Sequence, residues 1–223
     1  MNSGARHQTK RRILSDMHPT LRTLLLISFV LSGCATKPPQ PVARPLFNGH
    51  NLAGWVVMFG GEWTVADGVI VGRNGVDWST NPEKSGSWLR TDREYGDFIL
   101  ELEYAINAKG NSGIFLRSAL EKNPAFTGNE MQILDDRHLA KPEIWSTGAL
   151  YDVVAASKVM SKPAGEWNQV RIEARGLRVN IWLNGEQILR EAPLRSTRGY
   201  LGLQNHDDKS VVQFRNIRLT ELR

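Results

Sequence analysis

The stretch DFILELEY, residues 97–104, shows most clearly how this chain folds. Apolar side chains occupy every second position in it, and they are Phe98, Leu100, Leu102 and Tyr104. Because successive side chains of a β-strand point to opposite faces of a sheet, these four share one face while Glu101 and Glu103 lie on the other. The stretch therefore predicts a strand with one buried face and one face in water.

The same alternation continues on both sides of this strand, from Leu46 to the end of the chain. Clusters of glycine, asparagine, aspartate and proline separate the alternating runs, and no long stretch has the 3.6-residue period of a helix. Further strands are expected at residues 62–71, 87–90, 113–117, 129–134, 148–154, 167–174, 177–183, 199–204 and 211–222. About ten short strands without helices predict an all-β domain of two packed antiparallel sheets, a sandwich or jelly roll.

Two local signals add detail to this prediction. Asn184-Gly185 is typical of a type I′ turn and should join the preceding strand to residues 187–190 as a tight hairpin. In the last run the apolar positions change parity between Phe214 and Ile217, which predicts a β-bulge at residues 215–216.

The first 33 residues are typical of a signal peptide. A basic region comes first, and an apolar run from Leu24 to Leu31 follows, interrupted only by Ser28. A membrane-spanning helix needs about 20 consecutive apolar residues, so a retained anchor is disfavoured. Met17 offers a second start site, and a chain beginning there would keep the same export signal.

A cysteine closes this segment in the sequence Leu31-Ser32-Gly33-Cys34, where small residues suit a cleavage site. We expect the mature protein to begin at Cys34 with lipid on its sulfur; the alternative is a free thiol. Residues 35–45 are proline-rich and predict a semi-extended tether, followed by one domain at residues 46–223. Ala35 favours the periplasmic face of the outer membrane over inner-membrane retention.

The net charge of +5 comes mostly from the signal peptide. That segment holds five of the 28 lysines and arginines and one of the 23 acidic residues, which leaves a charge of +1 on residues 34–223. Such a balance gives no basis for nucleic-acid binding. With Cys34 bound to lipid, the domain has no cysteine for disulfides or thiolate metal sites, so its stability must come from its core.

Polar residues in phase with buried positions mark a candidate site. Glu130 and Gln132 alternate with apolar residues in the run 129–134. Arg117 lies two residues beyond Phe115. It is either a clamp for an oxyanion or carbonyl, because its guanidinium stays charged, or the partner of Glu130 in a structural ion pair.

His206 and Gln204 are in phase at the end of another predicted strand. A histidine side chain is suited to proton transfer near neutral pH, so His206 is either a proton-transfer group or a turn histidine ahead of residues 207–208. Gln204, like Gln132, either satisfies backbone groups at the end of a sheet or binds sugar hydroxyls, because an amide both donates and accepts hydrogen bonds. Tyr151 lies at a similar position in its own run.

The longest predicted loop covers residues 135–146, and long loops of compact domains are often functional. Asp135 and His138 offer carboxylate and imidazole ligands for a divalent cation, with a solvated loop as the alternative, since their spacing matches no strong metal motif. Trp145 in the same loop is a candidate for stacking on a sugar ring.

Nine segments carry a more specific signal. They are LFNGHNLAGW (46–55), YGDFILELEY (95–104), NSGIFLR (111–117), GNEMQILDD (128–136), TGALYDVV (147–154), AGEWNQVRIE (164–173), WLNG (182–185), GYLGLQNH (199–206) and VVQFRNIRLTEL (211–222). In this order they resemble the 3-keto-disaccharide hydrolase domain family, formerly a domain of unknown function. The resemblance implies a concanavalin-like jelly roll, frequent export as a lipoprotein, and action on glycosides oxidised to a ketone at carbon 3. One departure is Asp207, which follows His206 where the family usually has glycine.

The chemistry of such a substrate explains the residue set. A ketone at carbon 3 acidifies the proton on carbon 2, so a base can remove it, and the resulting enolate expels the aglycone from carbon 1 before water adds. This needs a base, an enolate stabiliser and an acid for the leaving oxygen. We expect Glu130 and His206 to transfer protons, and Arg117 or a divalent cation to stabilise the enolate. The candidates for substrate binding are Gln132, Tyr151, Gln204, Asn111 and Trp145.

Two other functions are compatible with the same fold. A non-catalytic carbohydrate-binding lipoprotein is the first, because such sandwiches often serve as lectins. A conventional endoglucanase is the second, and it requires paired carboxylates. Gln132 stands one strand alternation from Glu130, where the second carboxylate would lie, and this argues against an endoglucanase.

Overall fold

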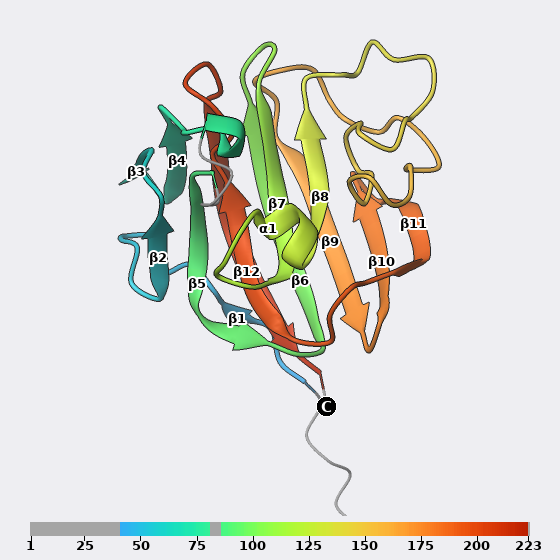
Figure 1. Ribbon diagram of the computed structural model, residues 1–223, viewed down its shortest axis with the longest axis horizontal. Coiled ribbons are helices and arrows are strands. Elements are labelled where there is room, and N and C mark those ends of the chain that lie inside the picture. Colours follow the sequence, from blue (N-terminus) through green and yellow to red (C-terminus); the bar gives the residue numbers. More distant parts are fainter. Residues whose placement is uncertain (1–40, 81–85, 223) are drawn as a thin grey trace, which may run out of the picture. The chain divides into compact units, whose positions relative to one another are not determined.

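The computed structural model describes residues 41–80 and 86–222, which belong to one compact unit (Figure 1). The predicted signal peptide, Cys34 and residues 35–40 of the predicted tether lie outside the described residues. Within the described ranges, no helix is long and apolar enough to cross a membrane.

The described chain forms two antiparallel sheets, and this confirms the predicted all-β jelly-roll class. The larger sheet consists of β1 (Arg44–Pro45), β3 (Glu62–Ala66), β4 (Val69–Arg73), β6 (Phe98–Ile106), β9 (Asn168–Arg175), β10 (Arg178–Leu183), β11 (Glu186–Pro193) and β13 (Val212–Glu221). Its strand order is β11-β10-β9-β6-β13-β4-β3, and β1 also pairs with β13.

The smaller sheet carries a pocket on its outer face. It consists of β2 (Trp55–Met58), β5 (Trp88–Tyr95), β7 (Asn111–Ser118), β8 (Asn129–Leu134) and β12 (Gly199–Gln204). Its strand order is β2-β5-β12-β7-β8. Two short helices were not predicted from the sequence, the 3-10 helix η1 (Trp78–Thr80) and the α-helix α1 (Pro124–Thr127). The latter packs against β7 and β8, in front of the smaller sheet in Figure 1.

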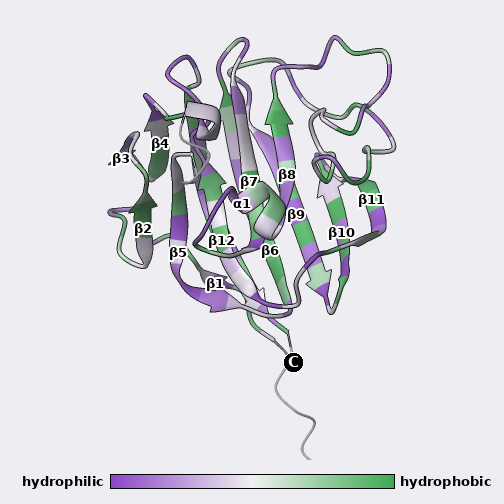
Figure 2. Cartoon of the chain, viewed as in Figure 1, coloured by the Kyte–Doolittle hydropathy of each residue, from purple (hydrophilic) through white to green (hydrophobic). Residues whose placement is uncertain are grey.

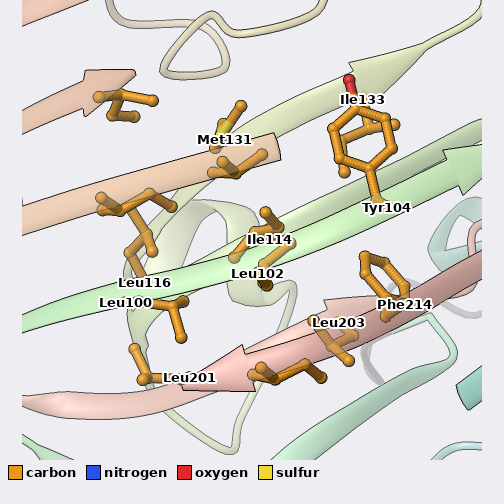
Figure 3. Close-up of a cluster of buried hydrophobic side chains, with 14 of the residues drawn as sticks. Leu100, Leu102, Tyr104, Ile114, Leu116, Met131, Ile133, Leu201, Leu203 and Phe214 are labelled. Atoms are coloured by element: carbon orange, nitrogen blue, oxygen red, sulfur yellow. The ribbon is translucent and has the colours of Figure 1, made fainter. Parts of the chain in front are cut away.

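The core lies between the two sheets. The four apolar side chains of the predicted strand at 97–104 belong to β6, and each is at most 3% exposed. Figure 3 shows three of them, with Phe214 of β13, beside buried side chains of β7, β8 and β12. Figure 2 shows the same alternation, since hydrophilic and hydrophobic residues follow one another along most strands. Burial of one strand face on each sheet is therefore the main stabilising contribution.

The two predicted local features are confirmed. Asn184 and Gly185 both have positive φ, 53° and 86°, as a type I′ turn requires, and they join β10 to β11. The register of β13 against β6 shifts between Arg215 and Arg218, and Asn216 has a φ of 54°. This is the β-bulge expected from the parity change.

Three predicted elements differ from the structure. Residues 148–154 form turns rather than a strand, because Gly148 and Asp152 have positive φ and interrupt the extended backbone. The run 62–71 is divided into β3 and β4 by a turn at Asp67-Gly68. The last two residues of the predicted tether form β1, in register with Arg218 and Leu219.

Candidate functional site

A pocket lies on the outer face of the smaller sheet, beside α1. Six of its lining residues are the polar candidates from the sequence, and they are Asn111, Glu130, Gln132, Tyr151, Gln204 and His206. The other four are Trp78, Asn123, Ala125 and Phe126. The cavity that these residues line has a volume of about 60 Å³, and it opens to solvent. The structure thus brings together polar candidates that are up to 95 positions apart in the sequence, from Asn111 to His206.

The floor of the pocket depends on a glycine. Gly113 of β7 is in register with Gln132 of β8, and Phe115 is in register with Glu130. A Cβ atom at position 113 would lie 1.9 Å from Oε1 of Glu130, so the glutamate side chain occupies the space that a larger residue would fill. The bare backbone of β7 therefore allows Glu130 to lie across the sheet.

The carboxyl group of Glu130 is buried, and little in its surroundings replaces the hydration that it loses. The residue is 3% exposed, and its Oε1 atom has no hydrogen-bond partner among the described residues. Burial raises the pKa of Glu130 to about 8, because the charged form loses its hydration. A carboxyl group with this pKa can accept and return a proton near neutral pH, as a general acid–base catalyst must.

Two further buried oxygens accompany this carboxyl group. Oδ1 of Asn111 and Oε1 of Gln204 are also buried without a partner in the part of the chain that the structure describes. Leaving a buried acceptor unsatisfied costs about 1–3 kcal/mol, so such atoms usually meet a ligand or ordered water. Three unpaired acceptors around one pocket are suited to the hydroxyl donors of a sugar.

His206 is held by its neighbour in the sequence. Its Nδ1 atom lies 2.9 Å from Oδ2 of Asp207, while Nε2 has no hydrogen bond to the described residues. Oδ1 of Asp207 accepts from the backbone N–H groups of Lys209 and Ser210 and from the Ser210 hydroxyl. Burial alone would raise the pKa of Asp207, but these hydrogen bonds and the one with His206 outweigh it, so the pKa is lowered. Asp207 therefore stays ionised and orients the imidazole.

The same loop also positions Asn111. The hydroxyl of Ser210, which donates to Asp207, accepts from the backbone N–H of Asn111 at 2.8 Å. Asp207, the residue that departs from the pattern of the resembled family, thus organises this loop. Through Ser210 it connects His206 with Asn111, and both residues line the pocket.

Tyr151 belongs to the turn segment that follows β8. Its backbone N–H donates to the carbonyl of Glu130 at 2.8 Å, which fixes the segment against the edge of the sheet. Burial raises the pKa of Tyr151, and the nearby charges of Glu130 and Asp152 raise it further. The hydroxyl therefore remains protonated and can donate a hydrogen bond into the pocket.

The assignment of Arg117 as a clamp is wrong, and so is its pairing with Glu130. Its side chain is 1% exposed and donates to the carbonyls of Gly96, Gly176 and Ser196 and to Oδ1 of Asp97 at 3.0 Å. The physical reason is an irregular register between β7 and β12, together with a φ of 55° at Arg117. This bulge takes Arg117 out of the alternation that Phe115 follows, so it lies away from the pocket.

The predicted loop at 135–146 does not contribute to the lining of the pocket. Trp145 is 46% exposed and is absent from the lining. Asp135 accepts a hydrogen bond from the backbone of Lys109, and His138 is exposed. Across residues 41–80 and 86–222, no group of three or more His, Cys, Asp and Glu side chains is placed to share a metal ion. The candidate cation site at Asp135 and His138 therefore gains no support.

Sequence reasoning missed the aromatic side of the pocket. Trp78 comes from η1 and Phe126 from α1, and neither stands in an alternating run. One signal for α1 was present, since Asn123-Pro124 combines a favoured N-cap with proline in the first turn. Oδ1 of Asn123 indeed accepts from the backbone N–H of Ala125 at 2.9 Å.

Comparison with known proteins places the chain in a family. Residues 42–220 match the model of the 3-keto-α-glucoside-1,2-lyase-like domain. A protein of Bacteroides thetaiotaomicron named 3-keto-disaccharide hydrolase is 27% identical over 227 residues, which cover 79% of this chain and 77% of the relative.

Solved structures agree with this assignment. A Parabacteroides distasonis protein provisionally named a glycosyl hydrolase has a TM-score of 0.67 at 28% identity, over 81% of this chain and 94% of the other. The carbohydrate-binding module CBM66 from Bacillus subtilis shares the fold, with a TM-score of 0.55 at 18% identity, over 75% of this chain and 96% of the module. The chain therefore belongs to the 3-keto-α-glucoside-1,2-lyase-like family, as its sequence motifs predicted, and it is a glycosyl hydrolase.

Proposed function

We propose that this hydrolase cleaves glycosides that carry a ketone at carbon 3, by removing the proton from carbon 2 and eliminating the aglycone from carbon 1. The observation that carries the proposal is the buried carboxyl group of Glu130, the one acidic side chain among the described residues that line the pocket, whose pKa of about 8 suits proton transfer at neutral pH. Ordinary glycosidases use two carboxylates, whereas elimination next to a ketone needs one base. The name of the Bacteroides relative supports the same substrate class.

In the proposed reaction Glu130 acts as the base. Its ionised carboxylate takes the proton from carbon 2, and the electrons of the C–H bond form the enolate of the carbon 3 ketone. The enolate then re-forms the ketone and expels the glycosidic oxygen from carbon 1, which leaves a double bond between carbons 1 and 2. His206, oriented by Asp207, protonates the leaving oxygen, and water adds across the double bond to give the free 3-keto sugar.

In this proposal neutral hydrogen-bond donors stabilise the enolate, because the guanidinium of Arg117 is bonded to Asp97 and to backbone carbonyls away from the pocket. The hydroxyl of Tyr151 stays protonated and is placed beside Glu130, so it can donate to the enolate oxygen. Asn111, Gln132 and Gln204 bind the remaining hydroxyls in this proposal. Inactivation of the purified enzyme by EDTA would assign the enolate to a divalent cation instead of Tyr151.

The proposal is tested by comparing a 3-keto-glucoside with its parent glucoside. The wild-type protein should release aglycone only from the oxidised compound. Glu130→Gln should lower kcat/KM by about 10²–10⁴, the usual contribution of a general base, and His206→Gln should lower it most for poor leaving groups. Glu101→Gln, an exposed site on the other sheet, is the matched control and should be unchanged. Equal rates on oxidised and parent glucosides would refute the proposal.

We also propose that the protein is exported and held by lipid on Cys34 at the periplasmic face of the outer membrane. The basic region, the short apolar run and the small residues before Cys34 support this placement. An enzyme there would meet oxidised glycosides as they enter the periplasm.

A further inference from the structure

Three aromatic rings form a row along one side of the pocket. The ring centroids of Trp78 and Phe126 are 6.4 Å apart, and those of Phe126 and Tyr151 are 6.1 Å apart. The three residues come from separate parts of the chain, namely η1, α1 and the turn segment after β8. Phe126 is the central member, since it contacts both of the others. We call these three residues the aromatic rim.

Two of the three rim residues are exposed, although aromatic side chains on the floor of the same sheet are buried. Trp78 is 36% exposed and Phe126 is 43% exposed, whereas Trp88 and Phe115 on the floor of the sheet are at most 1% exposed. Helix α1 is fixed by a hydrogen bond from the Ser118 hydroxyl to the carbonyl of Pro124 at 2.7 Å. The protein therefore holds Phe126 at the mouth of the pocket, and apolar surface exposed beside a pocket indicates a binding surface.

Polarity divides the pocket into two parts. The floor carries the unpaired oxygens of Asn111, Glu130 and Gln204, which require hydrogen-bond donors. The side chains of the rim offer a single hydroxyl group and the indole N–H of Trp78, and neither Trp78 nor Phe126 carries a hydrogen-bond acceptor. A hydroxyl-rich sugar ring therefore suits the floor, while the group attached to it would lie against the rim with few hydrogen-bond partners.

The angles between the rings indicate what kind of group fits there. The planes of Trp78 and Phe126 are 77° apart, and those of Phe126 and Tyr151 are 59° apart. The three rings are therefore inclined to one another and do not form a single flat surface. Aromatic rings prefer edge-to-face and offset contacts, so a further planar ring can meet one rim residue with its edge and the next with its face.

We propose that the aromatic rim is the subsite for the leaving group and that it selects aglycones with an aromatic ring. This rests on the function proposed above, in which the sugar lies over Glu130 and the aglycone departs from carbon 1 through the mouth of the pocket. The enzyme then prefers aryl 3-keto-glucosides to 3-keto-disaccharides, because a second sugar finds few hydrogen-bond partners at the rim.

The test compares the 3-keto derivatives of 4-nitrophenyl glucoside and of methyl glucoside, with a 3-keto-disaccharide as the third substrate. The four proteins are the wild type, Phe126→Ala, Phe126→Leu and Leu177→Ala. Leu177 is an exposed apolar residue that does not line the pocket, and it serves as the control. Each variant is compared with the wild type on the same substrate, so differences in leaving-group reactivity cancel.

Phe126→Ala should lower kcat/KM for the aryl substrate by about tenfold and for the methyl substrate by less than about threefold. Phe126→Leu should recover part of the loss, and Leu177→Ala should change neither rate. Equal losses on both substrates, or no loss on the aryl substrate, would overturn the inference. A loss on a 3-keto-disaccharide as large as that on the aryl substrate would also overturn it, because the rim would then bind sugars.

Failure of the proposed function gives a different result. If the wild type cleaves none of the three keto substrates, the proposed reaction is refuted, and the rim is then tested by binding alone. Titration of wild type and Phe126→Ala with 4-nitrophenyl glucoside and methyl glucoside, followed by calorimetry, should show tighter binding of the aryl compound in the wild type only. Equal affinities in both proteins would refute the rim as an aryl subsite.

Discussion

At the scale of single residues, two buried ionisable groups have opposite environments. Arg117 donates to three carbonyl oxygens and one carboxylate, so its charge is fully compensated. Glu130 has one carboxylate oxygen without any partner among the described residues, and burial raises its pKa to about 8. A compensated charge fixes the fold, whereas an uncompensated carboxyl group can change its protonation state during a reaction.

Replacement of Arg117 should therefore reduce stability and leave catalysis unaffected. Arg117→Met leaves three carbonyl groups without their donor and should lower the free energy of unfolding by about 2–4 kcal/mol, measured by urea denaturation. The control is Arg93→Met, because the exposed pair of Arg93 with Glu221 should contribute at most about 1 kcal/mol. A large fall in kcat per folded molecule of Arg117→Met would show that the guanidinium acts in the reaction after all.

The raised pKa of Glu130 predicts how stability depends on pH. Between pH 4.5, the ordinary pKa of the group, and about pH 8, the folded protein holds a proton that the unfolded chain has released. The free energy of unfolding should therefore fall as pH rises through this interval, by up to about 1 kcal/mol per pH unit, and this contribution should be constant above it.

Comparison of urea denaturation at pH 5 and pH 8 measures this effect. Glu130→Gln cannot ionise, so the difference in stability between the two pH values should be smaller than in the wild type. Glu101→Gln should behave like the wild type, because Glu101 is exposed. Identical pH dependence in wild type and Glu130→Gln would mean that the buried carboxyl group is solvated in solution.

At the scale of secondary structure, the sequence predicts strands well wherever one face is buried. The alternation in β6 and the parity change at Asn216 are visible because apolar residues mark the core face. The bulge at Arg117 left no such mark, because the three residues before it are all apolar and show no alternation. Residues 148–154 were equally misleading, because turns packed on a sheet edge bury apolar side chains too.

The same limit applies to the site. Six polar residues could be predicted because they stand in phase within or beside strands, and the structure brings all six together. Trp78 and Phe126 reach the pocket from η1 and α1 through tertiary packing, which no periodicity records. Sequence patterns thus predict the floor of the pocket and Tyr151 of its rim, and they miss Trp78 and Phe126.

Gly113 provides a test of how the strands position the base. In Gly113→Ala the new methyl group would overlap Glu130, so the carboxylate must move and kcat/KM should fall by about 10²-fold. Gly96→Ala is the matched control, because a Cβ there meets nothing closer than 4.0 Å, and its activity should be unchanged. Wild-type activity in Gly113→Ala would show that the position of Glu130 in this structure is not the catalytic one.

At the scale of the whole molecule, most of the net positive charge lies in the segment that precedes the proposed lipid anchor. Processing would remove residues 1–33 and leave a nearly neutral domain on a proline-rich tether. In the full-length protein, Cys34→Ser should abolish incorporation of labelled palmitate and block cleavage of the signal peptide. Thr36→Ser, two residues further along, should incorporate lipid normally. Labelling of Cys34→Ser at the wild-type level would refute the assignment of the anchor.

The pairing of β1 with β13 has a consequence for protein engineering. Arg44 is in register with Leu219 and Pro45 with Arg218, in antiparallel direction, so the two ends of the described domain run side by side. A hairpin loop of about two to five residues could connect them, and new termini could be opened at the Asp67-Gly68 turn on the edge of the larger sheet. Such a circular permutant would keep every residue of the pocket in place while moving the points of attachment for a fusion partner.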